Sequence, residues 1–306
     1  MKILITGGTG YIGGRLANFL RKKNLKIIST SRKKNKHGLK IIKWNSPKNL
    51  RVLCQVMDVI INCAGFDVHK SKIKSKTLVA NSTNPFNLFK VANESGVKLF
   101  IFLSTAHVYK NKLSGKINEK TKAAAKHTYG LSKLDGEKRL INIRNKKTKL
   151  LILRPCNLFG YPNYKNKNCW KLLINSLIKS LVEKNKVTIL SKDNNYRNYS
   201  SIQSFCEFIY SIIKIFESNK KKIPAIMNYH SEKNLNITQI IQIILKRLKK
   251  IERKNKLQIF YKHKLLKKMD KLTYVSLYQK FFKTKYDKHF DNEISDLILY
   301  CKKAFS

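Results

Sequence analysis

The sequence predicts an α/β protein with a doubly wound parallel sheet and a smaller mixed α/β lobe. Through the first half of the chain, short apolar runs alternate with helical patterns, as in parallel strands joined by crossover helices. A glycine-rich turn follows the first run directly. After Pro155 helical patterns dominate and short strands separate them. We therefore expect one domain over residues 1–155 and a second lobe over residues 156–306, with a strand and a helix of the second part returning to the first domain.

Six apolar runs in the first half are expected to form the main sheet. They are residues 3–5, 26–30, 39–42, 59–61, 100–103 and 150–153. A helix is expected after the first run, because apolar residues from Ile12 to Leu20 recur at helical spacing. Another is expected from Pro85 to Glu94, since proline suits a first helical turn and Gly96 can end the helix.

The second lobe shows four helical patterns and one clear strand. The helical patterns cover residues 172–182, 205–216, 240–248 and 294–301, and the strand covers residues 187–190. The stretch from 246 to 271 is very basic, and most of it indicates neither a helix nor a strand.

Length and composition are those of a protein with an ample core. The chain has 306 residues, 42% of them hydrophobic. No run reaches the roughly 18–20 uncharged apolar residues that a membrane span requires, so none is expected. The six cysteines stand singly without a Cys-x-x-Cys pair, so no metal site or disulfide framework is expected. We expect a cytoplasmic protein with reduced thiols.

The net charge of +48 has two interpretations. One is a protein that binds nucleic acid or an anionic membrane; the other is a compositional bias of the whole proteome. The lysines spread along the entire chain and no nucleic-acid-binding motif accompanies them, which favours the bias. No specific nucleic-acid partner is expected, but the positive field would attract a phosphate-bearing substrate.

The turn after the first strand has the composition of a phosphate-binding loop. It reads Thr-Gly-Gly-Thr-Gly-Tyr-Ile-Gly over residues 6–13. Glycines there permit a tight turn, close approach of the backbone to a pyrophosphate, and close packing of helix on strand, while the helix N-terminus offers unpaired N–H groups. The predicted cofactor contacts are Gly7, Gly10, Tyr11, Ile12 and Gly13.

The end of the second strand bears on which dinucleotide is bound. NAD sites carry an acidic residue about 20 residues beyond the loop, which holds the ribose 2′-hydroxyl. The first acidic residue of this chain is Asp58, and the second strand instead ends in Ser31 and Arg32. These two side chains can hold a 2′-phosphate, so NADP is favoured slightly over NAD.

Three residues form a candidate catalytic set. Tyr129 and Lys133 are four residues apart and share one face of a helix. A nearby ammonium stabilises phenolate, so Lys133 is expected to lower the pKa of Tyr129 from about 10 and let it exchange a proton with a substrate hydroxyl. Thr105 follows the fifth strand, where ligands of open α/β sheets bind, and can hydrogen-bond the reacting oxygen.

With these motifs the chain resembles the extended short-chain dehydrogenase/reductase superfamily, and within it the NAD-dependent epimerase/dehydratase group, over nearly its full length. Residues 6–13 match the family's Thr-Gly-x-x-Gly-x-x-Gly, and Thr105, Tyr129 and Lys133 match its Ser/Thr–Tyr–Lys triad. The resemblance implies a Rossmann-type domain, a nicotinamide cofactor and a nucleotide-sugar substrate. It also implies a homodimer formed through a two-helix face, with Leu88, Val91 and Leu134 as candidate interface residues.

The resemblance assigns further residues. To the cofactor it assigns Cys63, Ala64 and Gly65 after the fourth strand, then Asn81, Lys133 and Pro155; to the substrate it assigns Asn157, in the segment after the sixth strand, and Arg197, where the family's arginine grips the sugar-nucleotide pyrophosphate.

Several positions depart from the family pattern. The 4,6-dehydratases have Asp-Glu directly after the catalytic threonine, where this chain has Ala106 and His107, which disfavours dehydration. His107 is instead a candidate substrate contact or second acid–base group. Asn45 stands where an aspartate is usual, which weakens the expected adenine contact.

We expect a nucleotide-sugar epimerase that removes a hydride from a sugar carbon and returns it to the other face. A keto-sugar-nucleotide reductase or dehydrogenase with NADP uses the same residues and stays open as an alternative. A third alternative, of another class, is a non-catalytic protein that binds dinucleotide or RNA on the same fold.

Overall fold

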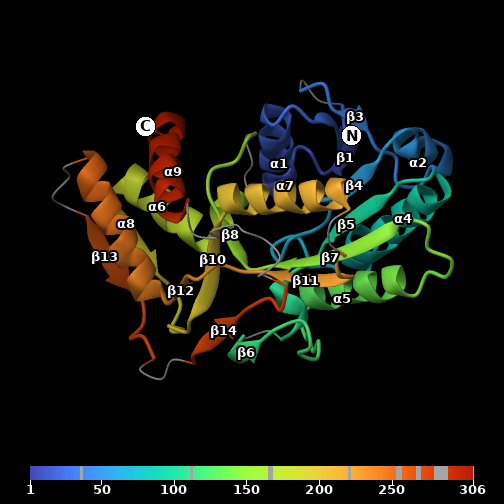
Figure 1. Cartoon of the computed structure of the whole chain (residues 1–306). Coiled ribbons are helices and arrows are strands. Elements are labelled where there is room, and N and C mark those ends of the chain that lie inside the picture. The colour runs from blue at the N-terminus through green and yellow to red at the C-terminus, as the bar shows by residue number, and fades with distance from the viewer. Residues whose placement is uncertain are drawn as a thin grey trace.

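The computed structural model describes residues 1–34, 37–110, 113–164, 168–219, 222–252, 257–266, 270–278 and 289–305. These residues form a large parallel sheet with helices on both faces and a smaller lobe beside one end of it (Figure 1). The α/β fold class expected from the sequence is confirmed.

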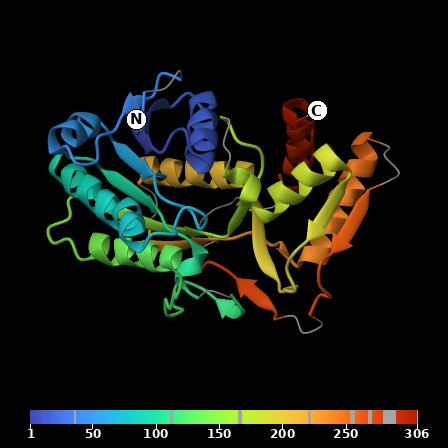
Figure 2. The ribbon, with the colours of Figure 1, turned by 180° about the vertical axis from the view of Figure 1, so that it is seen from behind.

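The main sheet is seven-stranded and parallel, in the order β11-β7-β5-β4-β1-β2-β3. Figure 2 shows the molecule from behind, with helices in front of the sheet on this side as well. Its strands are β1 (Lys2–Thr6), β2 (Lys26–Ser31), β3 (Lys40–Ile41), β4 (Val59–Asn62), β5 (Leu99–Leu103), β7 (Lys149–Pro155) and β11 (Ile226–Tyr229). The chain runs outward from β1 in two directions, toward β2 on one side and β4 on the other. This reversal creates a crevice at the carboxyl ends of β1 and β4, where open α/β sheets bind ligands.

Two cores lie on opposite faces of this sheet because successive side chains of a strand alternate. Ile3 and Ile5 pack against α1 and α7, whereas Leu4 packs on the other face with α2, α4 and α5. The helices are α1 (Tyr11–Lys22), α2 (Pro47–Cys54), α3 (Lys74–Leu78), the π-helical turn η1 (Val79–Thr83), α4 (Asn84–Glu94), α5 (Thr128–Ile141) and α7 (Ile202–Ser218). Leu88 and Val91 are buried in the second core, so they are not available to a dimer interface.

The smaller lobe has a core of its own, built from α6, α8 and α9 and short strands. Its elements are β8 (Asn157–Phe159), η3 (Cys169–Lys171), α6 (Leu173–Lys184), β9 (Lys186–Ile189), β10 (Arg197–Ser201), β12 (Asn234–Leu235), α8 (Ile237–Glu252), β13 (Gln258–Tyr261) and α9 (Phe290–Phe305). A separate pair, β6 (Gly115–Ile117) with β14 (Leu272–Tyr274), lies below the sheet, and the short turn η2 (Ala106–Val108) follows β5. Among the described helices, none has the length and apolar character needed to cross a membrane.

The second half of the chain contributes to both lobes. Strand β11 pairs with β7 at the edge of the main sheet, and α7 packs against α1. The run predicted as a strand at residues 39–42 forms only the two-residue β3. The basic stretch after residue 246 continues α8 as far as Glu252 and then contributes β13.

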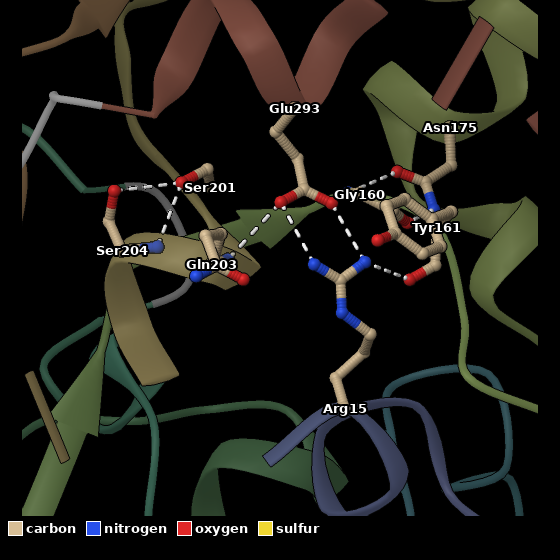
Figure 3. Close-up of polar contacts among 8 residues, drawn as sticks. All are labelled: Arg15, Gly160, Tyr161, Asn175, Ser201, Gln203, Ser204 and Glu293. Carbon is tan, nitrogen blue, oxygen red and sulfur yellow. Dashed lines mark hydrogen bonds and ion pairs between the residues drawn. The ribbon is translucent and has the colours of Figure 1, made fainter. Parts of the chain in front are cut away.

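A buried ion pair joins the two lobes (Figure 3). The guanidinium of Arg15, on α1, donates to both carboxylate oxygens of Glu293, on α9, at 3.0 and 3.1 Å. Arg15 also donates to the carbonyl of Tyr161 at 2.8 Å, and Glu293 accepts the backbone N–H of Gln203 at the start of α7. Four separate segments therefore meet at one pair of side chains, each at most 6% exposed.

Candidate active site

The glycine turn after β1 folds as a tight loop that leads into α1. Gly7 has a φ of +70°, which favours glycine, and its carbonyl accepts the N–H of Gly10 at 2.8 Å. A Cβ on Gly13 would lie 2.4 Å from the Gly7 oxygen, so only glycine allows the helix to start this close to the loop. Tyr11 and Ile12 occupy the first turn of α1, whose N–H groups have no partner within the helix.

The loop after β4 forms the other wall of the crevice. Thr6 donates its hydroxyl to the side chain of Asn62 at 2.6 Å and accepts the N–H of Ala64 at 3.1 Å, which joins the ends of β1 and β4. Cys63 and Gly65 flank Ala64, and a Cβ on Gly65 would lie 3.2 Å from the Lys133 ammonium. The candidate cofactor residues of this loop therefore lie beside a catalytic candidate.

Asn81 is a structural bridge. It is fully buried in the π-helical turn, accepts the N–H of Phe66 at 2.7 Å and donates to the Phe66 carbonyl and the Ser132 hydroxyl. These bonds hold the loop after β4 against α5. Pro155, another candidate cofactor contact, ends β7 inside the sheet and is aligned with Tyr229 of β11.

The third wall is the end of β2. Ser31 is buried and donates its hydroxyl to the Lys33 carbonyl at 2.5 Å, while Arg32 is exposed. Asn45 is also exposed and lies just before α2.

These residues fit a dinucleotide. Gly7, Gly10 and Gly13 carry no side chain that would keep a diphosphate from the backbone, and the helix N-terminus offers N–H donors to it. The walls of the crevice are backbone, hydroxyl and amide groups, and no carboxylate of the described residues stands at the end of β2, where a 2′-phosphate would be repelled. When bound, the dinucleotide would supply hydride transfer.

The structure brings Thr105, Tyr129 and Lys133 together from β5 and α5. The Thr105 hydroxyl lies within hydrogen-bonding reach of Tyr129 and also accepts the N–H of His107 at 3.2 Å. Lys133 is buried, and its ammonium donates to the Leu103 carbonyl, at the end of β5, at 2.8 Å. Tyr129 lies in the first turn of α5, and Lys133 lies one turn further along the same helix.

The electrostatics of Tyr129 differ from the expectation. Burial raises the pKa of Tyr129 to about 12; the hydrogen bond with Thr105 opposes this rise and the Asp67 carboxylate adds to it. The expected lowering of the Tyr129 pKa by Lys133 is therefore wrong, because desolvation of the phenol dominates. The phenol is protonated at neutral pH.

Two histidines pack around the phenol. The rings of His107 and His127 have their centroids 6.2 and 6.1 Å from that of Tyr129, and the His127 ring is stacked parallel to it. His127 caps α5 by accepting the Gly130 N–H at 2.9 Å. Burial, together with the positive charges of His127 and Arg197, lowers the pKa of His107 to about 4, so its ring is neutral at physiological pH. The Nδ1 atom of His107 is buried and finds no hydrogen-bond partner within the described parts of the chain.

The second lobe contributes its two candidate residues from paired strands. Asn157 on β8 donates to the Asn198 carbonyl of β10 at 3.0 Å, so its amide is partly used in joining those strands. Arg197 begins β10, contacts Asp193 at 3.3 Å and lies close enough to His107 to affect its pKa. The substrate candidates thus converge on the same side as the triad.

Asp67 is a residue that the motif analysis missed. It lies in the loop after β4, accepts the N–H of Lys70 at 2.9 Å and is close enough to Tyr129 to raise its pKa. The sequence did offer a signal for Asp67: acidic residues are few in the first half of the chain, so each of them stands out. The described residues contain no cluster of histidine, cysteine and carboxylate side chains that would hold a metal ion.

Comparisons with known proteins identify the family and the fold. The sequence model of the NAD dependent epimerase/dehydratase family matches residues 3–228. A UDP-glucose 4-epimerase of Vibrio cholerae is 29% identical over 170 residues, which is 52% of this chain and 52% of that protein. The chain is thus matched over about half the length of this curated relative.

Two solved structures share the fold over nearly all of both chains. MoeE5 in complex with UDP-glucose and NAD superposes with a TM-score of 0.80 at 16% identity and covers 100% of each chain. RMD from Pseudomonas aeruginosa complexed with NADPH has a TM-score of 0.78 at 16% identity over 99% of each. Since the family match spans most of the sequence, this chain belongs to the NAD-dependent epimerase/dehydratase family.

Proposed function

We propose that the protein is a nucleotide-sugar epimerase that uses NADP or NAD as a bound redox cofactor. The observation that carries the proposal is the convergence of Thr105, Tyr129 and Lys133 on the crevice walled by the glycine loop. Ala106 and His107 occupy the place of the acidic pair of dehydratases, which argues against elimination of water.

In this proposal Tyr129 moves the proton of the reacting sugar hydroxyl. Its pKa of about 12 keeps it protonated at neutral pH, and positive charge brought close by a bound cofactor would favour its phenolate. Thr105 orients the reacting oxygen, and Lys133 contributes a buried positive charge one turn further along α5. Arg197 holds the diphosphate, and Asn157 and His107 contact the sugar.

For the cofactor, the end of β2 supports NADP slightly over NAD. Arg32 is exposed at this position, and Ser31, whose hydroxyl donates to the Lys33 carbonyl, braces the turn that carries Arg32. Replacing Arg32 with glutamine is expected to weaken NADPH binding about tenfold relative to NADH, the loss of one charged hydrogen bond. Titration of the intrinsic fluorescence of each reduced cofactor measures this, and equal losses for both would contradict the assignment.

The activity is tested by incubating the pure protein with a panel of nucleotide sugars and each dinucleotide, and analysing the products. An epimerase converts one sugar to its epimer without net change in reduced nicotinamide and retains bound dinucleotide. A net change in nicotinamide absorbance would identify a reductase or dehydrogenase instead.

The variant Tyr129→Phe, which removes only the hydroxyl, tests the proposed proton transfer. We expect turnover to fall at least about a hundredfold, as for loss of a general acid–base group, with dinucleotide binding retained. Unchanged turnover would refute the role of Tyr129, and absence of any turnover in the wild type would favour a non-catalytic binding protein. A homodimer stays a prediction, which light scattering of the purified protein tests.

A further inference from the structure

Helix α5 is tied to the end of β5 at two consecutive residues. The ammonium of Lys133 donates to the Leu103 carbonyl at 2.8 Å, and the hydroxyl of Ser104 donates to the Glu137 carboxylate. Lys133 and Glu137 are four residues apart and lie on the same face of α5. Thr105 follows Ser104 directly, so the second tie fixes the backbone from which this catalytic candidate projects.

Glu137 is itself held from the far side by Arg154 on β7. The Arg154 Nε donates to one carboxylate oxygen at 3.0 Å, and a terminal nitrogen donates to the other. Both side chains are at most 5% exposed. The Arg154 guanidinium also lies 4.9 Å from the centre of the Tyr109 ring, and the Arg154 carbonyl accepts the Tyr274 hydroxyl at 2.8 Å.

We propose that Glu137 is a positioning residue for the reaction: its carboxylate, oriented by Arg154, fixes the end of β5 through Ser104 and supplies the negative charge that faces Lys133. This proposal rests on the epimerase-type function proposed above. It assigns a role in the chemistry to an ion pair that would otherwise count as part of the core.

The charge on Glu137 distinguishes a positioning role from a role in packing alone. Burial lowers the pKa of Lys133 to about 8, while Cys63 and then Glu137 oppose the lowering. Burial raises the pKa of Cys63 to about 12, so the thiol is uncharged where Lys133 titrates. Glu137 is therefore the anion that opposes the lowering of the Lys133 pKa, and Arg154 is the cation behind it. A residue that served packing alone would leave the Lys133 titration unchanged when its charge is removed.

The first test needs no substrate. Protein labelled with ¹⁵N at the lysine side chains is titrated by NMR, and the Lys133 signal is assigned by its loss in Lys133→Arg. In Glu137→Gln we expect the Lys133 midpoint to move to lower pH by about half a unit or more, because the anion is lost and Arg154 is left unbalanced. An unchanged midpoint in folded protein overturns the proposal. The control is Glu94→Gln, an exposed carboxylate on α4, which is expected to leave the midpoint in place.

If Glu137→Gln does not fold, the double variant Glu137→Gln/Arg154→Met removes both charges. A smaller shift to lower pH is expected there, and no shift overturns the proposal.

The second test uses Ser104→Ala, which keeps the ion pair and removes only the tie to β5. With the nucleotide sugar that the wild type converts, kcat is expected to fall about tenfold with KM and the Lys133 midpoint unchanged, as for loss of one hydrogen bond in the transition state. An unchanged kcat overturns the positioning role. If the wild type converts no nucleotide sugar, the proposed function fails, while the NMR titration still decides the role of Glu137.

Discussion

Replacing Glu293 with glutamine should destabilise the protein strongly, because it leaves the Arg15 guanidinium buried without an anion. Breaking a buried ion pair by removing one partner costs about 3–5 kcal/mol. An unfolding entropy of roughly 2.1 cal/mol/K per residue gives about 0.6 kcal/mol/K for 306 residues, so this cost corresponds to a drop in Tm of about 5–8 °C. Glutamine has nearly the shape of glutamate, and Arg15 keeps its hydrogen bond to the Tyr161 carbonyl. The loss of stability therefore measures the contribution of the charge on Glu293.

The assay is thermal and urea unfolding of Glu293→Gln beside Glu94→Gln. The Glu94 carboxylate lies 3.6 Å from Arg51, and both side chains are 56% exposed, so its loss should cost less than about 1 kcal/mol. The double variant Arg15→Met/Glu293→Met should recover most of the loss, since apolar replacement of both partners is often neutral. If Glu293→Gln and Glu94→Gln lose the same stability, the pair does not hold the lobes together.

Two further predictions concern the site. Because the pKa of His107 is lowered from 6.5 to about 4, the unfolded state binds more protons in this range, so the wild type should lose about 2 kcal/mol of stability from about pH 7 to about pH 5. This loss of stability between the two pH values, measured by urea unfolding, should be smaller in His107→Asn. A loss of the same size in the variant and the wild type would count against a neutral buried ring. Gly13→Ala places a Cβ 2.4 Å from the Gly7 oxygen and should weaken NADPH binding at least about tenfold, measured by fluorescence titration. Gly14→Ala, where the nearest atoms are 3.1 Å away, should lose less, and similar affinities for the two variants would contradict the argument.

The parallel sheet was predictable because its strands are continuous apolar runs buried on both faces. The runs at 59–61 and 100–103 form β4 and β5, which are wholly buried. The placement of Thr105, Tyr129 and Lys133 near one another was predictable for a related reason. It depends on the carboxyl end of one strand and on a four-residue spacing along one helix, and both are local features.

The elements that sequence reasoning missed depend on partners far along the chain. Strand β8 has three residues and forms against β10, and β12 has two. Such short segments carry too few side chains for a periodic pattern, so their pairing follows from the tertiary structure.

The sequence likewise does not reveal which charged residues form pairs in the structure. Arg15 and Glu293 are 278 residues apart, and in so basic a chain nothing marks one arginine as buried. The raised pKa of Tyr129 likewise follows from burial and from Asp67, which the four-residue spacing to Lys133 does not reveal.

The return of β11 to the main sheet has a consequence for truncated forms of the protein. A fragment ending at residue 155 would lack β11 and α7, leaving the backbone of β7 unpaired along one edge and the apolar face of α1 open to water. Unpaired strand edges flanked by apolar surface recruit other chains, so this fragment would self-associate and precipitate when expressed alone. The domain with the candidate cofactor site is thus completed by α7 and β11, so it can fold fully only after most of the chain has been translated.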